Sequence, residues 1–134
     1  MQRLVLLCAV LYLCLTASLM AQDAVKADPK HYSVVSENDQ VRILKVHYGP
    51  HEKSVMHSHP NLVSIFLTDA KVKMTTPDGK SQDMTMPKGQ ATWADAGTHL
   101  PENLNDTPLE GFLIELKGKA PAKPAAKKAD AMKK

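Results

Sequence analysis

The sequence is poor in cysteine, and the position of its two cysteines excludes several kinds of chemistry. Both of them, Cys8 and Cys14, lie near the start of a 134-residue chain. A domain formed by the remaining residues has no disulfide, no thiolate metal ligand and no cysteine nucleophile. Such a domain depends on its apolar core for stability.

Long apolar runs are also scarce, and the longest lies at the N-terminus. It covers Leu4–Leu15, follows Arg3, and leads through small residues to Ala21. The run is shorter than the roughly 20 apolar residues of a transmembrane helix. This layout predicts a secretory signal peptide over residues 1–21, and therefore an exported protein, periplasmic or secreted, without a membrane span after cleavage. The alternative is an uncleaved anchor, because Leu19 is larger than the residue usually found there.

The other end of the chain has little apolar variety. Residues 118–134 consist almost entirely of Lys, Ala and Pro, which predicts a disordered basic tail. From Lys117 onward there are seven Lys and one Asp, so of the net charge of +3 this end contributes +6 and Arg3 contributes +1, which leaves −4 for residues 22–116. The basic character thus gives no argument for nucleic-acid binding. The tail could contact anionic surfaces, or it is a solvated extension.

The region between these ends has no helical periodicity. Short segments rich in β-branched residues recur about every ten residues, separated by Gly, Pro, Asn or Asp. Predicted strands cover residues 31–35, 41–48, 57–67, 71–75, 81–86, 89–93 and 109–116. We therefore predict one all-β domain over residues 31–117, a small antiparallel barrel with side chains filling all but one pocket. Residues 22–30, closed by Pro29, are predicted to be a linker.

Two histidines one residue apart stand just before an apolar run. In a strand, residues i and i+2 point to the same face, so His57 and His59 are expected to project side by side. His99 follows beyond a predicted hairpin, and a rolled barrel can bring it back beside them. Neutral imidazole binds Zn, Fe, Mn, Ni and Cu. The spacing predicts a three-histidine metal site with open positions, and the alternative is three surface histidines without metal.

Other polar residues near this motif are weaker candidates. His47, His51, Glu52 and Glu102 could each supply a fourth ligand or an acid–base group. Their places on a strand surface or in turns more simply predict solvated side chains.

The remaining notable side chains have two interpretations each. Trp93 is the only tryptophan, and it either packs in the core or forms a wall of the pocket. Four methionines suggest either soft-metal ligands or core filling: Met56, Met74, Met84 and Met86. The sequence has no Gly-rich phosphate loop, no Ser-His-Asp order and no pair of catalytic carboxylates.

Two stretches resemble the conserved motifs of the cupin superfamily. The first runs from Gly49 through His57-Ser58-His59 into the apolar strand, and the second is GQATWADAGTHLPEN, with Gly89, Gly97, His99 and Asn103. The resemblance covers residues 31–117. It implies a jelly-roll barrel of roughly six to eight strands, with His57, His59 and His99 as metal ligands. Because small cupins often dimerise, it also implies a homodimer.

The chain departs from the cupin pattern in three places. The family usually has Glu four or five residues after the second histidine, where this chain has Val63 and Ser64. Asp95 replaces a Pro of the second motif, and only Thr98 separates Gly97 from the histidine. The resemblance then implies either a three-histidine site, as in some cupin dioxygenases, or a degenerate one. Loss of the carboxylate should weaken binding of Mn more than of Zn, Cu or Ni.

Three functions are consistent with these observations. The first is an exported metal-binding cupin acting on a small molecule in dioxygenase- or isomerase-like chemistry. The second is a non-catalytic module that binds a sugar or an organic acid and has a degenerate metal site. The third is a surface-associated protein in which the basic tail matters most. Similar barrels host many activities, so the fold does not identify a substrate.

Overall fold

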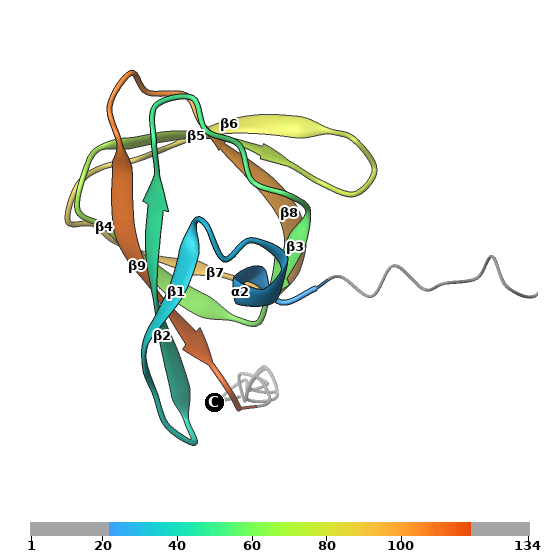
Figure 1. Cartoon of the computed structure of the whole chain (residues 1–134), viewed down its shortest axis with the longest axis vertical. Coiled ribbons are helices and arrows are strands. Elements are labelled where there is room, and N and C mark those ends of the chain that lie inside the picture. Colours follow the sequence, from blue (N-terminus) through green and yellow to red (C-terminus); the bar gives the residue numbers. More distant parts are fainter. Residues whose placement is uncertain (1–21, 119–134) are drawn as a thin grey trace, which may run out of the picture.

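A computed structural model of the protein describes residues 22–118 (Figure 1). These residues form antiparallel strands and one short helix, as the alternating sequence pattern predicts. The elements are α2 (Ala24–Ala27), β1 (Tyr32–Glu37), β2 (Val41–Tyr48), β3 (His57–His59), β4 (Leu62–Phe66), β5 (Ala70–Thr75), β6 (Ser81–Met86), β7 (Ala91–Ala94), β8 (Gly97–Asn103) and β9 (Leu109–Leu116). The predicted signal peptide and nearly all of the predicted basic tail lie outside the described residues.

The strands form two sheets that curve around a common interior, and this confirms the predicted small jelly-roll barrel. One sheet has the order β1-β2-β9-β4-β7 and the other the order β3-β8-β5-β6. Strands far apart in sequence are neighbours: β2 pairs with β9, and β3 pairs with β8. Figure 1 shows the resulting barrel with the short β3 at one edge, beside α2. No helix within residues 22–118 is long and apolar enough to cross a membrane.

The core follows from the two-residue period of the strands. Burial alternates along β4 and along β9, so that every second side chain points inward. Leu62, Phe66 and Leu113 are among the buried apolar residues, and each such side chain stabilises the fold by about 1.5–3 kcal/mol. At Gly111, an added Cβ would lie 2.8 Å from the carbonyl oxygen of Ile65, so only glycine lets β9 approach β4 this closely.

Two local predictions differ from the structure. The predicted strand over residues 57–67 is interrupted at Pro60, which separates β3 and β4 into different sheets. Conversely, residues 97–103 form a regular strand, β8, although no strand was predicted there. Its partners β3 and β5 supply hydrogen bonds on both sides.

The segment predicted as a linker, residues 22–30, lies against the barrel. Ala24 is fully buried, and Asp23 caps α2 and forms an ion pair with Arg42. The backbone of Ser58 donates a hydrogen bond to the carbonyl of Gln22 at 2.8 Å. These contacts, together with the hydrogen bond from Ser54 to the buried Asp28, make the segment part of the folded domain.

Candidate metal centre

The structure brings the three predicted histidines together. His57 and His59 project from β3 toward the interior, and His99 lies directly opposite His57 on β8. The ring centroids are separated by 4.8 Å for His57–His59, 5.1 Å for His57–His99 and 5.3 Å for His59–His99. One ring nitrogen from each lies within 4.8 Å of the others. The barrel register therefore produces the cluster that the spacing predicted.

Burial keeps these rings in the form that binds metals. Burial, together with the neighbouring His59 and His57, lowers the pKa of His99 to about 4. Burial also lowers the pKa of His57. At neutral pH both imidazoles are uncharged, so each has a lone pair for a cation.

A buried carboxylate holds His59 in place. The His59 Nδ1 donates a hydrogen bond to Glu115 on β9 at 2.6 Å, and Glu115 is 1% exposed. The Nε of Arg42 donates to the other oxygen of Glu115 at 2.6 Å. A histidine that donates its Nδ1 proton to a carboxylate presents a more basic Nε2 to a metal.

His57 is held by its own loop. Its Nδ1 donates to the carbonyl of Val55 at 2.8 Å, and Ser54 Oγ lies 3.2 Å away. The Ser54 hydroxyl in turn donates to the buried Asp28. Because Val55 accepts at Nδ1, the Nε2 of His57 also carries a free lone pair.

The facing nitrogens of the two β3 histidines are close enough to bind one cation. His57 Nε2 and His59 Nε2 are 3.0 Å apart. With both protons on Nδ1 there is no hydrogen between these atoms, so two lone pairs face each other. Two imidazole nitrogens that bind one ion at about 2.1 Å are roughly 3.0–3.4 Å apart. This donor set therefore fits a first-row divalent ion.

The sequence patterns did not predict which carboxylate contacts this site. The resemblance directed attention to residues 63 and 64, but the Ser64 hydroxyl donates to the carbonyl of Thr92. The acid is Glu115, and it contacts the side of His59 away from the cluster. In the sequence, Glu115 is marked only by its place on the odd-numbered face of β9. That face is buried and also carries Leu109, Gly111 and Leu113.

The weaker candidates lie outside the cluster of three histidines. His47 pairs with Glu110, and His51 pairs with Asp106, both at the surface. Glu52 accepts hydrogen bonds from the Gly49 backbone and from Lys30, which lowers its pKa to about 2. His47 and His51 are solvated, as predicted, whereas Glu52 is half-buried and also contacts the buried His31.

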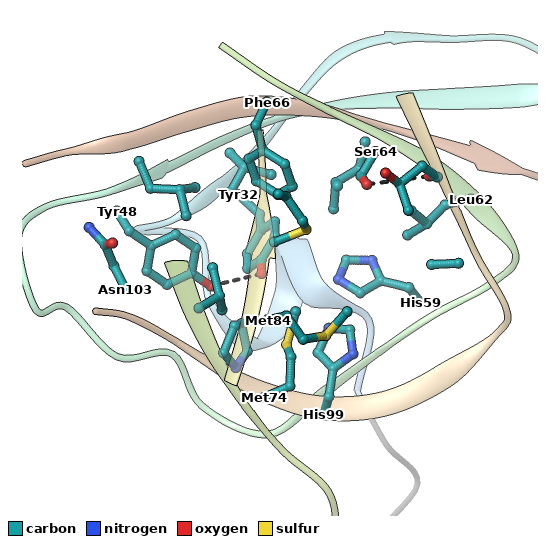
Figure 2. A pocket seen from close by; sticks show the side chains of 18 of the residues that line it. Tyr32, Tyr48, His59, Leu62, Ser64, Phe66, Met74, Met84, His99 and Asn103 are labelled. Atoms are coloured by element: carbon teal, nitrogen blue, oxygen red, sulfur yellow. Dashed lines mark hydrogen bonds between the residues drawn. The ribbon is translucent and has the colours of Figure 1, made fainter. Parts of the chain in front are cut away.

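A cavity of about 120 Å³ opens beside His59 and His99 (Figure 2). Its walls are mostly apolar, and no Lys, Arg, Asp or Glu lines it. Trp93 forms part of the wall and is 52% exposed, so the second of its two interpretations, a wall of the pocket, is confirmed and core packing is wrong. Met74, Met84 and Met86 line the same cavity.

Two tyrosines give the cavity its polar interior. The ring of Tyr32 lies 4.8 Å from His57 and 5.5 Å from His59, measured between centroids. The Tyr48 hydroxyl donates to the Tyr32 hydroxyl at 2.7 Å. Burial raises the pKa of both phenols, so both remain protonated.

Comparisons with known proteins show the fold. No protein-family model and no curated protein matches the sequence. Solved structures do match. A cupin domain from Bordetella pertussis has 24% identity and a TM-score of 0.61, and the match covers 65% of this chain and 92% of that one. A double-stranded β-helix protein from Klebsiella pneumoniae has 18% identity and a TM-score of 0.53, with 67% and 78% covered. An RmlC-like cupin from Methanocaldococcus jannaschii has 15% identity and a TM-score of 0.51, with 63% and 77% covered.

Proposed function

We propose that this protein, which has the fold of the cupins, is an exported member of that superfamily that binds a divalent transition metal through His57, His59 and His99. The observation that carries the proposal is the convergence of one ring nitrogen from each of the three histidines within 4.8 Å, with His57 Nε2 and His59 Nε2 3.0 Å apart. A divalent cation bound to both nitrogens makes that contact favourable. The Glu115 carboxylate adds negative charge at a short distance and favours a cation further.

The donor set restricts the metal. Three neutral imidazoles suit Zn, Fe, Ni and Cu better than Mn, which prefers oxygen ligands. When bound, such an ion supplies Lewis-acid or redox chemistry at its open positions. The protein residues hold the imidazoles in one tautomer and orientation, and the apolar walls limit the entry of water. A small molecule in the cavity would lie next to His59 and His99.

A non-catalytic ligand-binding module is the second candidate. It is favoured by the cavity lining, which contains no carboxylate and no lysine to transfer protons. The two candidates share the metal site and differ in turnover. Substrate consumption by metal-loaded protein supports the enzyme, whereas ligand-induced stabilisation without consumption supports the module.

Elemental analysis of protein purified without chelator tests the metal proposal. We expect about one first-row metal ion per chain, since the described cluster offers one set of three ligands. His59→Ala should abolish this content. His47→Ala is the matched control, because His47 is a β2 histidine paired with Glu110 at the surface. Equal zinc affinity in both variants, measured by calorimetry, would contradict the proposal.

Export is tested by the N-terminus of the mature protein. Cleavage after Ala21 would leave Gln22 first, next to the segment that packs on Ser58. Sequencing the N-terminus of protein recovered from outside the cytoplasm should give Gln22. An intact Met1 on that protein would indicate an uncleaved anchor instead.

A further inference from the structure

Tyr32 presents a hydrogen-bond donor beside the histidine cluster. Its side chain lines the cavity, and the residue is 4% exposed. Its oxygen accepts the proton of Tyr48 at 2.7 Å. Within residues 22–118 no atom accepts the proton of Tyr32 itself. Figure 2 shows the hydroxyls of this pair meeting inside the cavity, between Asn103 and His59. A buried donor without an acceptor costs about 1–3 kcal/mol unless a ligand or water accepts it.

Two other polar side chains of the cavity wall, Asn103 and Ser64, are already engaged. The amide nitrogen of Asn103 donates to the carbonyls of Gly49 and Thr107, and its oxygen accepts from the backbone of Asn105. The hydroxyl of Ser64 donates to a backbone carbonyl. Among the two tyrosines and the asparagine of this wall, Tyr32 therefore has the donor that remains available to a ligand.

The size and lining of the cavity define the rest of the ligand. Its volume is about 120 Å³, and a protein cavity of about 150 Å³ holds a molecule the size of benzene. The walls are formed by side chains such as Phe66, Met74 and Leu113. A second charged group on the ligand would be desolvated without a partner. The same argument disfavours a sugar, whose hydroxyls would face these apolar walls.

We propose that Tyr32 donates a hydrogen bond to the anionic oxygen of a small, apolar monocarboxylate whose hydrocarbon part fills the cavity. The assignment rests on the proposed metal site, because the cation at His57, His59 and His99 provides the positive charge for the carboxylate. Tyr48 acts through Tyr32, because the hydrogen bond it donates polarises the Tyr32 hydroxyl and makes it a stronger donor.

Titration of 3-methylbutanoate into zinc-loaded protein tests the assignment. Trp93 reports binding, since it is the only tryptophan and lines the cavity. Tyr32→Phe keeps the ring but removes the donor, and we expect affinity about 10–100-fold lower, as for a hydrogen bond to a charged acceptor. Tyr48→Phe is the matched control from the same hydroxyl pair, with an expected loss of about 2–5-fold. Glutarate and 3-methylbutylamine should each bind at least about 10-fold more weakly than 3-methylbutanoate.

Each result decides one part of the assignment. No binding of 3-methylbutanoate, or equal affinity in wild type and Tyr32→Phe, overturns it. A larger loss in Tyr48→Phe makes Tyr48 the donor and also overturns it. Equally tight glutarate overturns the apolar ligand class. Loss of zinc affinity in Tyr32→Phe would mean that the hydroxyl supports the metal site and not the ligand, and it also overturns the assignment. If the wild type binds no zinc, the proposed function fails instead, and the same titration of metal-free protein then decides the role of Tyr32.

Discussion

The histidines of β3 and the histidine of β8 are held in different ways. His59 and His57 each donate from Nδ1 to a protein acceptor, Glu115 for one and Val55 for the other. His99 makes no hydrogen bond to any atom within residues 22–118. The cluster thus combines two braced ligands, each held by a hydrogen bond from its Nδ1, with one ligand, His99, whose ring has no such bond.

The difference follows from where the strands lie. β3 has three residues and is an edge strand, paired only with β8. Short edge strands have few ladder hydrogen bonds, so their side chains need support from elsewhere. β8 has seven residues and lies between β3 and β5, which fixes the backbone of His99 without help from its ring. Side-chain bracing is therefore expected to matter most for the ligands on the weakest strand.

The largest effects are expected when a histidine of the cluster is removed, and they distinguish the loss of a metal ligand from the loss of its supporting hydrogen bond. His59→Ala and His99→Ala should both lower zinc affinity by more than about 100-fold, since each removes a ligand. Only His59→Ala should strongly destabilise the metal-free fold, by about 1.5–3 kcal/mol, because it removes a hydrogen bond to the buried Glu115. His99→Ala should cost about 1 kcal/mol or less. Calorimetry and urea unfolding in chelator measure the two quantities, and equal destabilisation would remove the distinction.

The next largest effect is expected when His59 is kept and the charge of Glu115, which supports it, is removed. Glu115→Gln retains an acceptor for His59 but loses the charge that also pairs with Arg42. Zinc affinity should fall about 10–100-fold, as it does when the hydrogen-bond partner of a metal ligand is lost. Glu110→Gln is the control, since Glu110 lies on the same strand but pairs with the surface residue His47. An effect of the same size in both variants would argue against bracing.

The parts of this site differ in how far they could be predicted. The alternation of apolar residues and the turn residues between them predicted the barrel, because both are local properties of the chain. The pairing of His57 with His59 was predicted for the same reason. Glu115 was not, because both faces of β9 carry apolar residues: Leu109 and Leu113 on one, Phe112 and Ile114 on the other. Which face is buried depends on the pairing with β4, which is a tertiary property.

Two other features could not be predicted from the sequence, because they also depend on tertiary contacts. The contact between Tyr32 and Tyr48 depends on the register of β1 with β2, which shifts between Val34 and Ser36. A one-residue slip would move the tyrosine to the other face of the sheet. The packing of residues 22–30 depends on partners far along the chain, Arg42 among them. A short polar segment gives no local sign of such partners.

As the pH falls, protonation of His99 should lower the stability of the protein before protonation of Glu52 does. The pKa of His99 is lowered from 6.5 to about 4 in the folded protein, so the unfolded chain binds the proton first. The free energy of unfolding of metal-free protein should therefore fall as the pH drops from about 6.5 toward 4. Glu52, with its pKa lowered from 4.5 to about 2, contributes only below about pH 4.5. Urea unfolding against pH should show a shallower slope between pH 6.5 and 4.5 for His99→Asn. An unchanged slope would show that His99 does not contribute.

The smallest effect is expected at the second contact of His57. Ser54 Oγ lies 3.2 Å from His57 Nδ1, whereas the Val55 carbonyl lies at 2.8 Å and accepts the proton. Ser54→Ala leaves the carbonyl in place, so zinc affinity should fall less than the roughly 10-fold lower limit for losing a partner outright. Stability should fall by about 1 kcal/mol, because Asp28 loses a hydrogen bond. Ser58→Ala provides the comparison, since Ser58 bonds Thr98 and no histidine. A zinc effect of Ser54→Ala as large as that of Glu115→Gln would mean that the hydroxyl, not the backbone, orients His57.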